Sequence, residues 1–218
     1  MLNKCKIAFL VLACACLLGP LSAQATQSPT DRVKEGVDKI IKILSAPAIT
    51  DPAQRDKAIE ELRDVADNYI DFKLTTMYAV GKPWLKMSPE LQNNLTNAFI
   101  QLLERTYLKR IPAYGGQGVN YTKEDIVGKK AKVVSELTDK EKKIVVEFRL
   151  RMVQGTWMIY DVVAEGVSLV ANYRSQFSQI LTDGTGEDLL KLIQERIQKL
   201  DEQGDGGSDD NATLVPQG

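Results

Sequence analysis

Apolar residues recur at intervals of three and four through the first half of the chain, the spacing that places them on one face of an α-helix. Val33, Val37, Ile40, Ile41 and Leu44 share such a face. The same spacing predicts further helices over about residues 59–69, 71–80 and 88–107. Because each helix has one apolar face, each must pack against another part of the fold.

Residues suited to helix ends mark two of the boundaries. Asp51 is expected to cap the second helix, with Pro52 at its first helical position. Ser88 is expected to cap the fourth helix, with Pro89 and Glu90 in its first turn.

The hydrophobic pattern changes to a period of two near residue 119, which is typical of β-strands. It predicts strands over about residues 119–126, 132–137, 144–153 and 157–164, followed by two helices over 169–181 and 189–200. Helices, then consecutive antiparallel strands, then helices indicate an α+β fold. We expect a four-stranded antiparallel sheet covered by amphipathic helices that enclose a cavity.

The two ends of the chain differ in composition from the rest. Lys4 and Lys6 precede an apolar stretch over residues 7–18, and small residues at Ala23 and Ala25 follow. This is the pattern of a secretory signal peptide over residues 1–25, cleaved near Ala25. We expect one domain over residues 26–203, and a disordered Gly- and Asp-rich tail over 204–218.

Composition excludes several classes of chemistry. The chain has no histidine, and its three cysteines, Cys5, Cys14 and Cys16, lie in the expected leader. Histidine-dependent nucleophiles and the common zinc sites are therefore excluded, and we expect no metal, no cofactor and no catalytic residue. The net charge of −1 becomes −3 without the leader, so we expect no nucleic-acid partner.

Two blocks of sequence stand out along the chain. The first is Tyr69-Ile70-Asp71-Phe72, followed by Gly81-Lys82-Pro83-Trp84 and Ser88-Pro89-Glu90-Leu91. The second is Tyr160-Asp161, then Glu165-Gly166-Val167-Ser168, then Tyr173-Arg174-Ser175 and Phe177. These two blocks resemble the MlaC family of periplasmic proteins. The resemblance implies an NTF2-like cradle in the periplasm that holds a phospholipid by its tails. It also implies two partners, an outer-membrane lipoprotein–porin complex and an inner-membrane ABC transporter with a lipid-binding ring subunit, and a role in outer-membrane lipid asymmetry.

Apolar side chains of the expected cradle are the candidates for contact with the lipid tails. They lie on the third, fourth and later elements of the pattern, and the alternative is that they simply form the core. The set is Phe72, Met77, Phe99, Leu103, Tyr107, Phe148, Leu150, Met152, Tyr160 and Val163.

Two other functions stay open at this point. A small-molecule isomerase or dehydratase could use Asp161 as its base in the same cradle, with Tyr160 as a donor. Neighbours in a regular strand point to opposite faces, which disfavours that pair, and Asp161 and Glu165 are expected to orient the turn before a helix capped by Ser168. The third possibility is an adaptor that binds only protein.

Two further features suggest docking and movement. Six lysines are expected to form a basic patch on a hairpin: Lys129, Lys130, Lys132, Lys140, Lys142 and Lys143. The patch is either simply a solvated hairpin or a docking site for an acidic partner or an anionic lipid surface. Gly81 and the loop over residues 115–118 flank the fourth helix and are candidate hinges.

Overall fold

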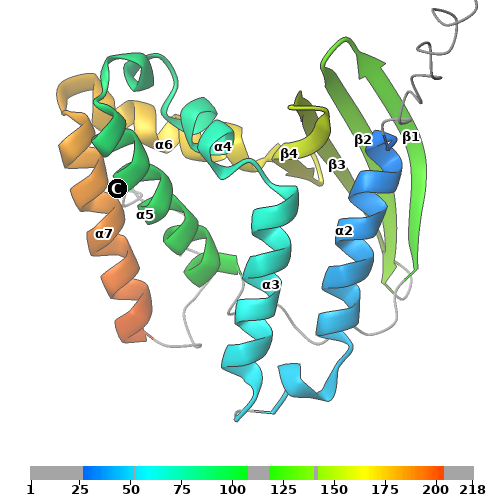
Figure 1. Cartoon of the computed structure of the whole chain (residues 1–218). Helices are drawn as coiled ribbons and strands as arrows, with labels where there is room; N and C mark the ends of the chain where they lie inside the picture. Colours follow the sequence, from blue (N-terminus) through cyan, green and yellow to red (C-terminus); the bar gives the residue numbers. More distant parts are fainter. Residues whose placement is uncertain (1–26, 52, 108–117, 140–141, 204–218) are drawn as a thin grey trace, which may run out of the picture.

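A computed structural model describes residues 27–51, 53–107, 118–139 and 142–203, and Figure 1 shows their arrangement. Four helices and two short 3-10 helices form the first half: α2 (Pro29–Leu44), η2 (Pro47–Ile49), α3 (Arg55–Tyr69), α4 (Phe72–Val80), η3 (Lys82–Lys86) and α5 (Pro89–Tyr107). Two helices end the described chain, α6 (Leu169–Asp183) and α7 (Gly186–Gln203). The α+β class predicted from the sequence is confirmed. The expected leader over 1–25 and tail over 204–218 lie outside the described residues.

The sheet has five strands where the sequence pattern predicted four. They follow one another in the order of the chain, each antiparallel to the next: β1 (Val119–Val127), β2 (Lys130–Asp139), β3 (Lys142–Val153), β4 (Thr156–Ala164) and β5 (Val167–Ser168). The fifth strand has two residues, too few for alternation to register. Glu165 and Gly166 form the turn before it, with φ angles of 50° and 84°. That left-handed pair is typical of a two-residue hairpin.

The two faces of the sheet have different neighbours. We call the face that α2 and α3 cover the inner face, and the opposite one the outer face (Figure 1). The strand register places Val133, Phe148 and Val162 side by side on the inner face. It places Lys132, Arg149 and Asp161 side by side on the outer face.

The buried apolar residues fall into two large clusters that different elements build. The helical cluster joins α4, α5, α6 and α7 around Phe99, Tyr173 and Phe177, with ring centroids 4.8 to 5.7 Å apart. The sheet-side cluster packs Val33 and Tyr69 of α2 and α3 on the inner face. A smaller cluster closes the far end of α2 and α3. Figure 1 shows the helices of the helical cluster, α4 to α7, to the left and the sheet to the right, with α3 between them.

Helix ends agree with the sequence at two positions and differ at one. Ser88 Oγ accepts a hydrogen bond from Leu91 N, and Ser168 Oγ from Ala171 N, as predicted. The prediction for the second helix was wrong, because α3 begins at Arg55 after Gln54. Asp51 instead accepts hydrogen bonds from Ala53 N and the Gln54 side chain, which hold a turn in front of the helix. Among the described residues, no helix has the length and apolar character that a membrane span requires.

Candidate functional site

A row of apolar side chains on the inner face of the sheet is only half-buried. We call it the inner strip, and it consists of Leu137, Ile144, Val146, Phe148 and Val162. It adjoins the part of the sheet that α2 and α3 cover, where Val133 and Leu150 are fully buried. The strip is thus apolar surface that the described helices leave incompletely packed.

Three candidate residues for lipid contact lie on β3 at this face. Phe148 belongs to the inner strip, while Leu150 is fully buried against Ala131 and Ile159. Met152 is half-buried opposite Trp157. The structure therefore brings these three together, with Leu150 in the floor of the face and the other two at its surface.

Candidates on the helices lie in a different environment. Phe99 is 1% exposed inside the helical cluster, and Met77 and Leu103 pack against that cluster. Phe72 is half-buried at the start of α4, and Tyr107 is 40% exposed at the end of α5. These residues are separate from the three on β3, which belong to the sheet-side cluster.

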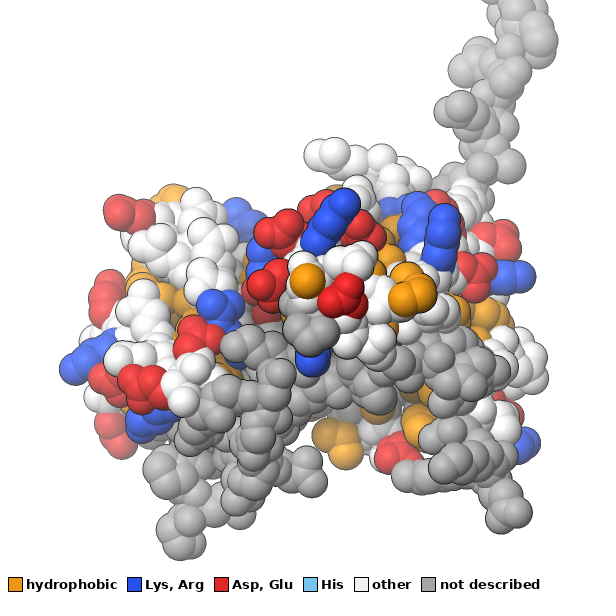
Figure 2. All heavy atoms as spheres, turned by 90° about the horizontal axis from the view of Figure 1, so that it is seen from below, with side chains coloured by type: hydrophobic (Ala, Val, Ile, Leu, Met, Phe, Trp, Pro, Cys, Tyr) orange, Lys and Arg blue, Asp and Glu red, His pale blue; other side chains and the backbone are white. Residues whose placement is uncertain are grey.

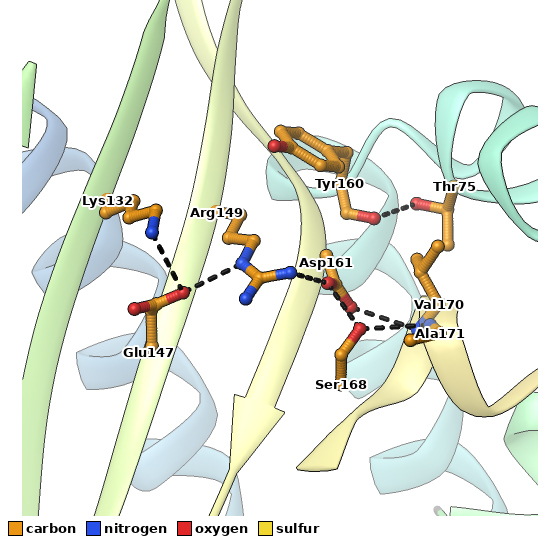
Figure 3. Close-up of polar contacts among 9 residues, drawn as sticks. All are labelled: Thr75, Lys132, Glu147, Arg149, Tyr160, Asp161, Ser168, Val170 and Ala171. Atoms are coloured by element: carbon orange, nitrogen blue, oxygen red, sulfur yellow. Dashed lines mark hydrogen bonds and ion pairs between the residues drawn. The ribbon is translucent and has the colours of Figure 1, made fainter. Parts of the chain in front are cut away.

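A bulge in β4 moves the last two candidates to the outer face. Arg149 pairs with Asp161 and Leu150 with Ile159, so Tyr160 is an extra residue without a partner in β3. Its ring lies on Tyr78 of α4, with centroids 5.1 Å apart, and beside Arg149 (Figure 3). Val163 pairs with Glu147, on the face opposite Phe148. The expectation of regular alternation at Tyr160 and Asp161 was therefore wrong.

Asp161 is 3% exposed and fully engaged by its neighbours (Figure 3). Its Oδ2 accepts hydrogen bonds from Arg149 at 3.0 Å and Ser168 Oγ at 2.7 Å, and its Oδ1 accepts one from Val170 N at 3.0 Å. Glu147 contacts Arg149 as well, and this hydrogen bond raises the pKa of the guanidinium above its usual value. The prediction that Asp161 orients the turn before α6 is confirmed.

An ion pair links α3 to α5 across the two halves of the molecule. Arg63 Nη2 donates to Glu104 Oε2 at 2.9 Å, and Arg63 Nε donates to the other carboxylate oxygen. The apolar residues of α3 belong to the sheet-side and end clusters, while those of α5 belong to the helical cluster. Sequence reasoning missed this pair because a charged residue on a polar helix face gives no signal of a partner 41 positions away.

Tyr121 places a polar atom beside the inner strip. It lies across from Ser135 on the inner face, and its hydroxyl is buried with no hydrogen-bond partner among the described residues. Burial, and to a smaller extent the charge of Asp38, raises the pKa of this hydroxyl to about 12. The weak pattern of the first strand offered no way to single it out.

The described lysines of the predicted basic patch are divided between two ends of the sheet. Lys129 and Lys130 stand at the β1–β2 turn, whereas Lys143 lies near the other end of β2, opposite Thr138. Ten residues of extended strand, about 30 Å, separate these ends. Lys140 lies outside the described residues. The single patch was a wrong prediction, because the strand is longer than the pattern indicated.

The described surface pockets do not have the character of a site for lipid tails. Their volumes are about 390, 440 and 300 Å³, and charged side chains contribute to the lining of each. No group of three or more acidic residues among the described parts of the chain could hold a metal ion.

Two comparisons with known proteins bear on this geometry. The sequence model of the MlaC protein family matches residues 34–195. The structure is similar to that of a phospholipid-binding protein from Ralstonia solanacearum, solved in complex with a phospholipid. The two are 25% identical, with a TM-score of 0.68, over 78% of this chain and 97% of that protein.

Proposed function

This chain belongs to the MlaC family, and on that premise we propose that it is a carrier that binds a phospholipid by its acyl chains. The observation that supports this most directly is the inner strip, an apolar surface that the described helices leave half-covered. The similar protein from Ralstonia solanacearum was solved in complex with a phospholipid. In our proposal the acyl chains lie against this strip, in an NTF2-like cradle between the sheet and the helices.

The physical need for such a carrier follows from the cost of hydrating acyl chains. Each methylene exposed to water costs about 0.8 kcal/mol, so a diacyl lipid resists leaving its membrane by roughly 20 kcal/mol or more. An apolar strip lowers this cost without any catalytic group. Tyr121, whose buried hydroxyl has no described partner, donates in this proposal to an ester carbonyl of the lipid.

We place this activity in the periplasm, after removal of the leader over residues 1–25. The carrier shuttles phospholipid between an outer-membrane lipoprotein–porin complex and an inner-membrane ABC transporter with a lipid-binding ring subunit. This exchange maintains the lipid asymmetry of the outer membrane. The support for location and partners is family membership together with the leader pattern.

The test is extraction of the purified mature protein with organic solvent, followed by mass spectrometry of the lipids. We expect phospholipid in stoichiometric amount. Phe148→Asp should remove it, because a carboxylate in the strip loses its hydration without gaining a partner. Val145→Asp is the matched control, since Val145 is 45% exposed on the outer face of the same strand. A folded Phe148→Asp variant with full lipid content contradicts this placement of the acyl chains.

The enzymatic alternative receives no support from the geometry. A general base needs a free lone pair directed at its substrate, and both oxygens of Asp161 already accept hydrogen bonds. Absence of lipid from the purified protein would favour the remaining alternative, an adaptor that binds only protein.

Release of the lipid requires the cradle to open, and we propose that α5 moves away from α3 when it does. The Arg63–Glu104 ion pair spans this boundary and breaks at low cost compared with an apolar interface. Gly81 is the described hinge candidate, with a φ of 76° that favours glycine. Of the other candidate, only Gly118 is described.

A covalent link between α3 and α5 tests this movement. Residues 27–203 contain no cysteine, so Arg63→Cys and Glu104→Cys can be joined with a short bis-maleimide. We expect the linked protein to exchange lipid more slowly than the same variant treated with a mono-maleimide. An unchanged exchange rate after linking contradicts the proposed opening.

A further inference from the structure

Two turns at one end of the molecule expose large aliphatic side chains to solvent. Leu85 in η3 is 80% exposed, and Val127 at the end of β1 is 79% exposed, with Ile126 beside it at 52%. Figure 1 shows η3, between α4 and α5, and the β1–β2 turn both at the upper end of the view. A single exposed aliphatic side chain is common on a protein surface, but two exposed turns at the same end, each next to lysines, are a candidate docking surface.

In both turns the backbone directs the exposed side chain, Leu85 in η3 or Val127 in the β1–β2 turn, toward solvent. In η3, Trp84 is 4% exposed in the helical cluster, and its carbonyl accepts a hydrogen bond from the Gln92 side chain at 2.9 Å. That anchor leaves the next residue, Leu85, facing water. In the other turn, Gly128 follows Val127, and no heavy atom beyond its two chain neighbours lies within 4 Å of the position a Cβ would take there. The turn is therefore open to solvent at this position.

Lysines flank both tips and are free to meet an anionic surface. Lys82 and Lys86 stand on either side of Leu85, and Lys129 and Lys130 follow Val127. Within the described parts of the chain, none of these four has an ion-pair partner, whereas Lys123, Lys132 and Lys143 each lie within 4 Å of a carboxylate. At the opposite end, seen from below in Figure 2, Lys and Arg side chains lie beside Asp and Glu side chains.

We propose that this end of the protein docks on an anionic lipid bilayer, with Leu85 and Val127 entering the interface and the four lysines facing the headgroups. Anionic leaflets attract lysines held near their surface. A bilayer accepts aliphatic side chains anywhere on its plane, whereas a protein would need two pockets at the spacing of these two turns. Two side chains and four charges give a weak and reversible attachment, which suits a protein that must leave again.

The proposed docking does not depend on lipid bound in the cradle. Its test distinguishes docking on a bilayer from binding of a phospholipid as cargo. Purified mature protein is mixed with vesicles of phosphatidylcholine alone, or of phosphatidylcholine with phosphatidylglycerol, and the bound fraction is measured by flotation. We expect binding to the anionic vesicles that falls at high salt. The Leu85→Ser/Val127→Ser double variant should bind at least roughly tenfold more weakly, because both side chains lose their transfer from water. The Lys82→Gln/Lys86→Gln/Lys129→Gln/Lys130→Gln variant should lose the dependence on salt.

Val145→Ser/Val167→Ser is the matched control, since these residues are 45% and 63% exposed on β3 and β5, away from both tips. It should bind the vesicles as the wild type does. All variants should keep the lipid content of the wild type in solvent extracts, which separates docking from cargo binding. Three results would overturn the proposal: no binding of wild type to protein-free vesicles, equal binding by the double variant, or binding only to vesicles that contain membrane proteins. The last result would assign the surface to a protein partner.

Discussion

The helical cluster and the inner face of the sheet are both apolar, but they are packed to different degrees. In the helical cluster, Phe99, Tyr173 and Phe177 are at most 1% exposed, and their rings meet edge to face or tilted. On the inner face, Val133 and Leu150 are fully buried, but the inner strip beside them is only half-covered. A closed core has no room for a ligand, whereas an incompletely covered face does.

This difference divides the candidate residues by role. In our proposal, those in the helical cluster stabilise the part of the fold that stays shut, and those on the inner strip contact the lipid. The Arg63–Glu104 pair lies between the two regions and connects them by charge. Changes in each region should therefore affect stability and lipid content in different proportions.

The largest effect is expected from Phe99→Ala in the helical cluster. Removing a fully buried phenyl ring should lower the free energy of unfolding by about 3–5 kcal/mol, because it leaves a cavity among rigid neighbours. Urea denaturation measures this loss, and solvent extraction should show unchanged lipid per folded molecule. A variant that keeps its stability but loses the lipid would place Phe99 in the cargo site and erase the distinction between the two regions.

The next effect concerns Asp161, which attaches α6 to the outer face. Asp161→Asn retains one oxygen but turns an N–H₂ group toward Arg149 or Val170 N, so we expect a loss of about 1–3 kcal/mol in the free energy of unfolding. Lipid content and the exchange rate of the folded fraction should remain those of the wild type. Loss of function in a stable variant with full lipid content would reopen the enzymatic interpretation.

Removing the Arg63–Glu104 ion pair between the two regions should have a smaller effect on the free energy of unfolding and a larger effect on the rate of lipid transfer. Arg63→Ala removes an ion pair whose arginine side chain is 45% exposed and whose glutamate side chain is 11% exposed. Arg105 stays 3.5 Å from that carboxylate, so the free energy of unfolding should fall by about 1 kcal/mol. Transfer of a fluorescent phospholipid to acceptor vesicles should become faster. Lys191→Ala is the control, because it removes an ion pair, the more exposed one with Glu195, that lies within α7 and does not cross the boundary. Equal transfer rates for both variants would argue against α3 and α5 as the opening boundary.

The smallest expected effect is a dependence on pH in the sheet-side region. A hydrogen bond from Lys39, with smaller contributions from Tyr69 and Gln27, lowers the pKa of Glu35 on α2 from 4.5 to about 2. Since the folded-state pKa is the lower one, this stabilisation is complete above pH 4.5 and disappears as the pH falls to about 2. Glu35→Gln should therefore flatten the fall of the melting temperature in that window, but only slightly, because the group is exposed.

Asp188 in the helical cluster region also has a lowered pKa, which allows the same melting measurement to be made there. Hydrogen bonds from the backbone and side chain of Thr185 at the start of α7 lower the pKa of Asp188. Asp188→Asn should also reduce the acid dependence of the melting temperature. If hydrogen exchange shows that acid loosens α2 and α7 together, the two regions do not respond separately.

The sequence was sufficient to predict the main helices and strands, but not the shortest strand or the irregularity within a strand. Apolar periodicity located the main helices and four strands, because it reports which face of each element is buried. The two-residue strand β5 left no such trace, although Glu165-Gly166 after a strand is a turn signal. The bulge at Tyr160 was equally invisible, because an extra residue changes the register without changing the composition.

For the candidate site, periodicity identified which residues are buried but not with which partners. Phe99 and Phe148 look alike in the sequence, yet they belong to separate clusters. Family resemblance indicated the kind of ligand, but it did not distinguish Val163 on the outer face from Val162 on the inner strip. These distinctions depend on long-range pairing, which a local pattern does not contain.

An ion pair connects α3 to α5, and this has a consequence for the protein without bound lipid. A guanidinium and a carboxylate that separate are each hydrated at once, so the opening edge presents ions to water. Had the same boundary been closed by leucines, every opening would have presented hydrocarbon, and two open molecules would have tended to stick to one another. In the opening that we propose, an ionic edge lets the molecule pass repeatedly through its open form without self-association.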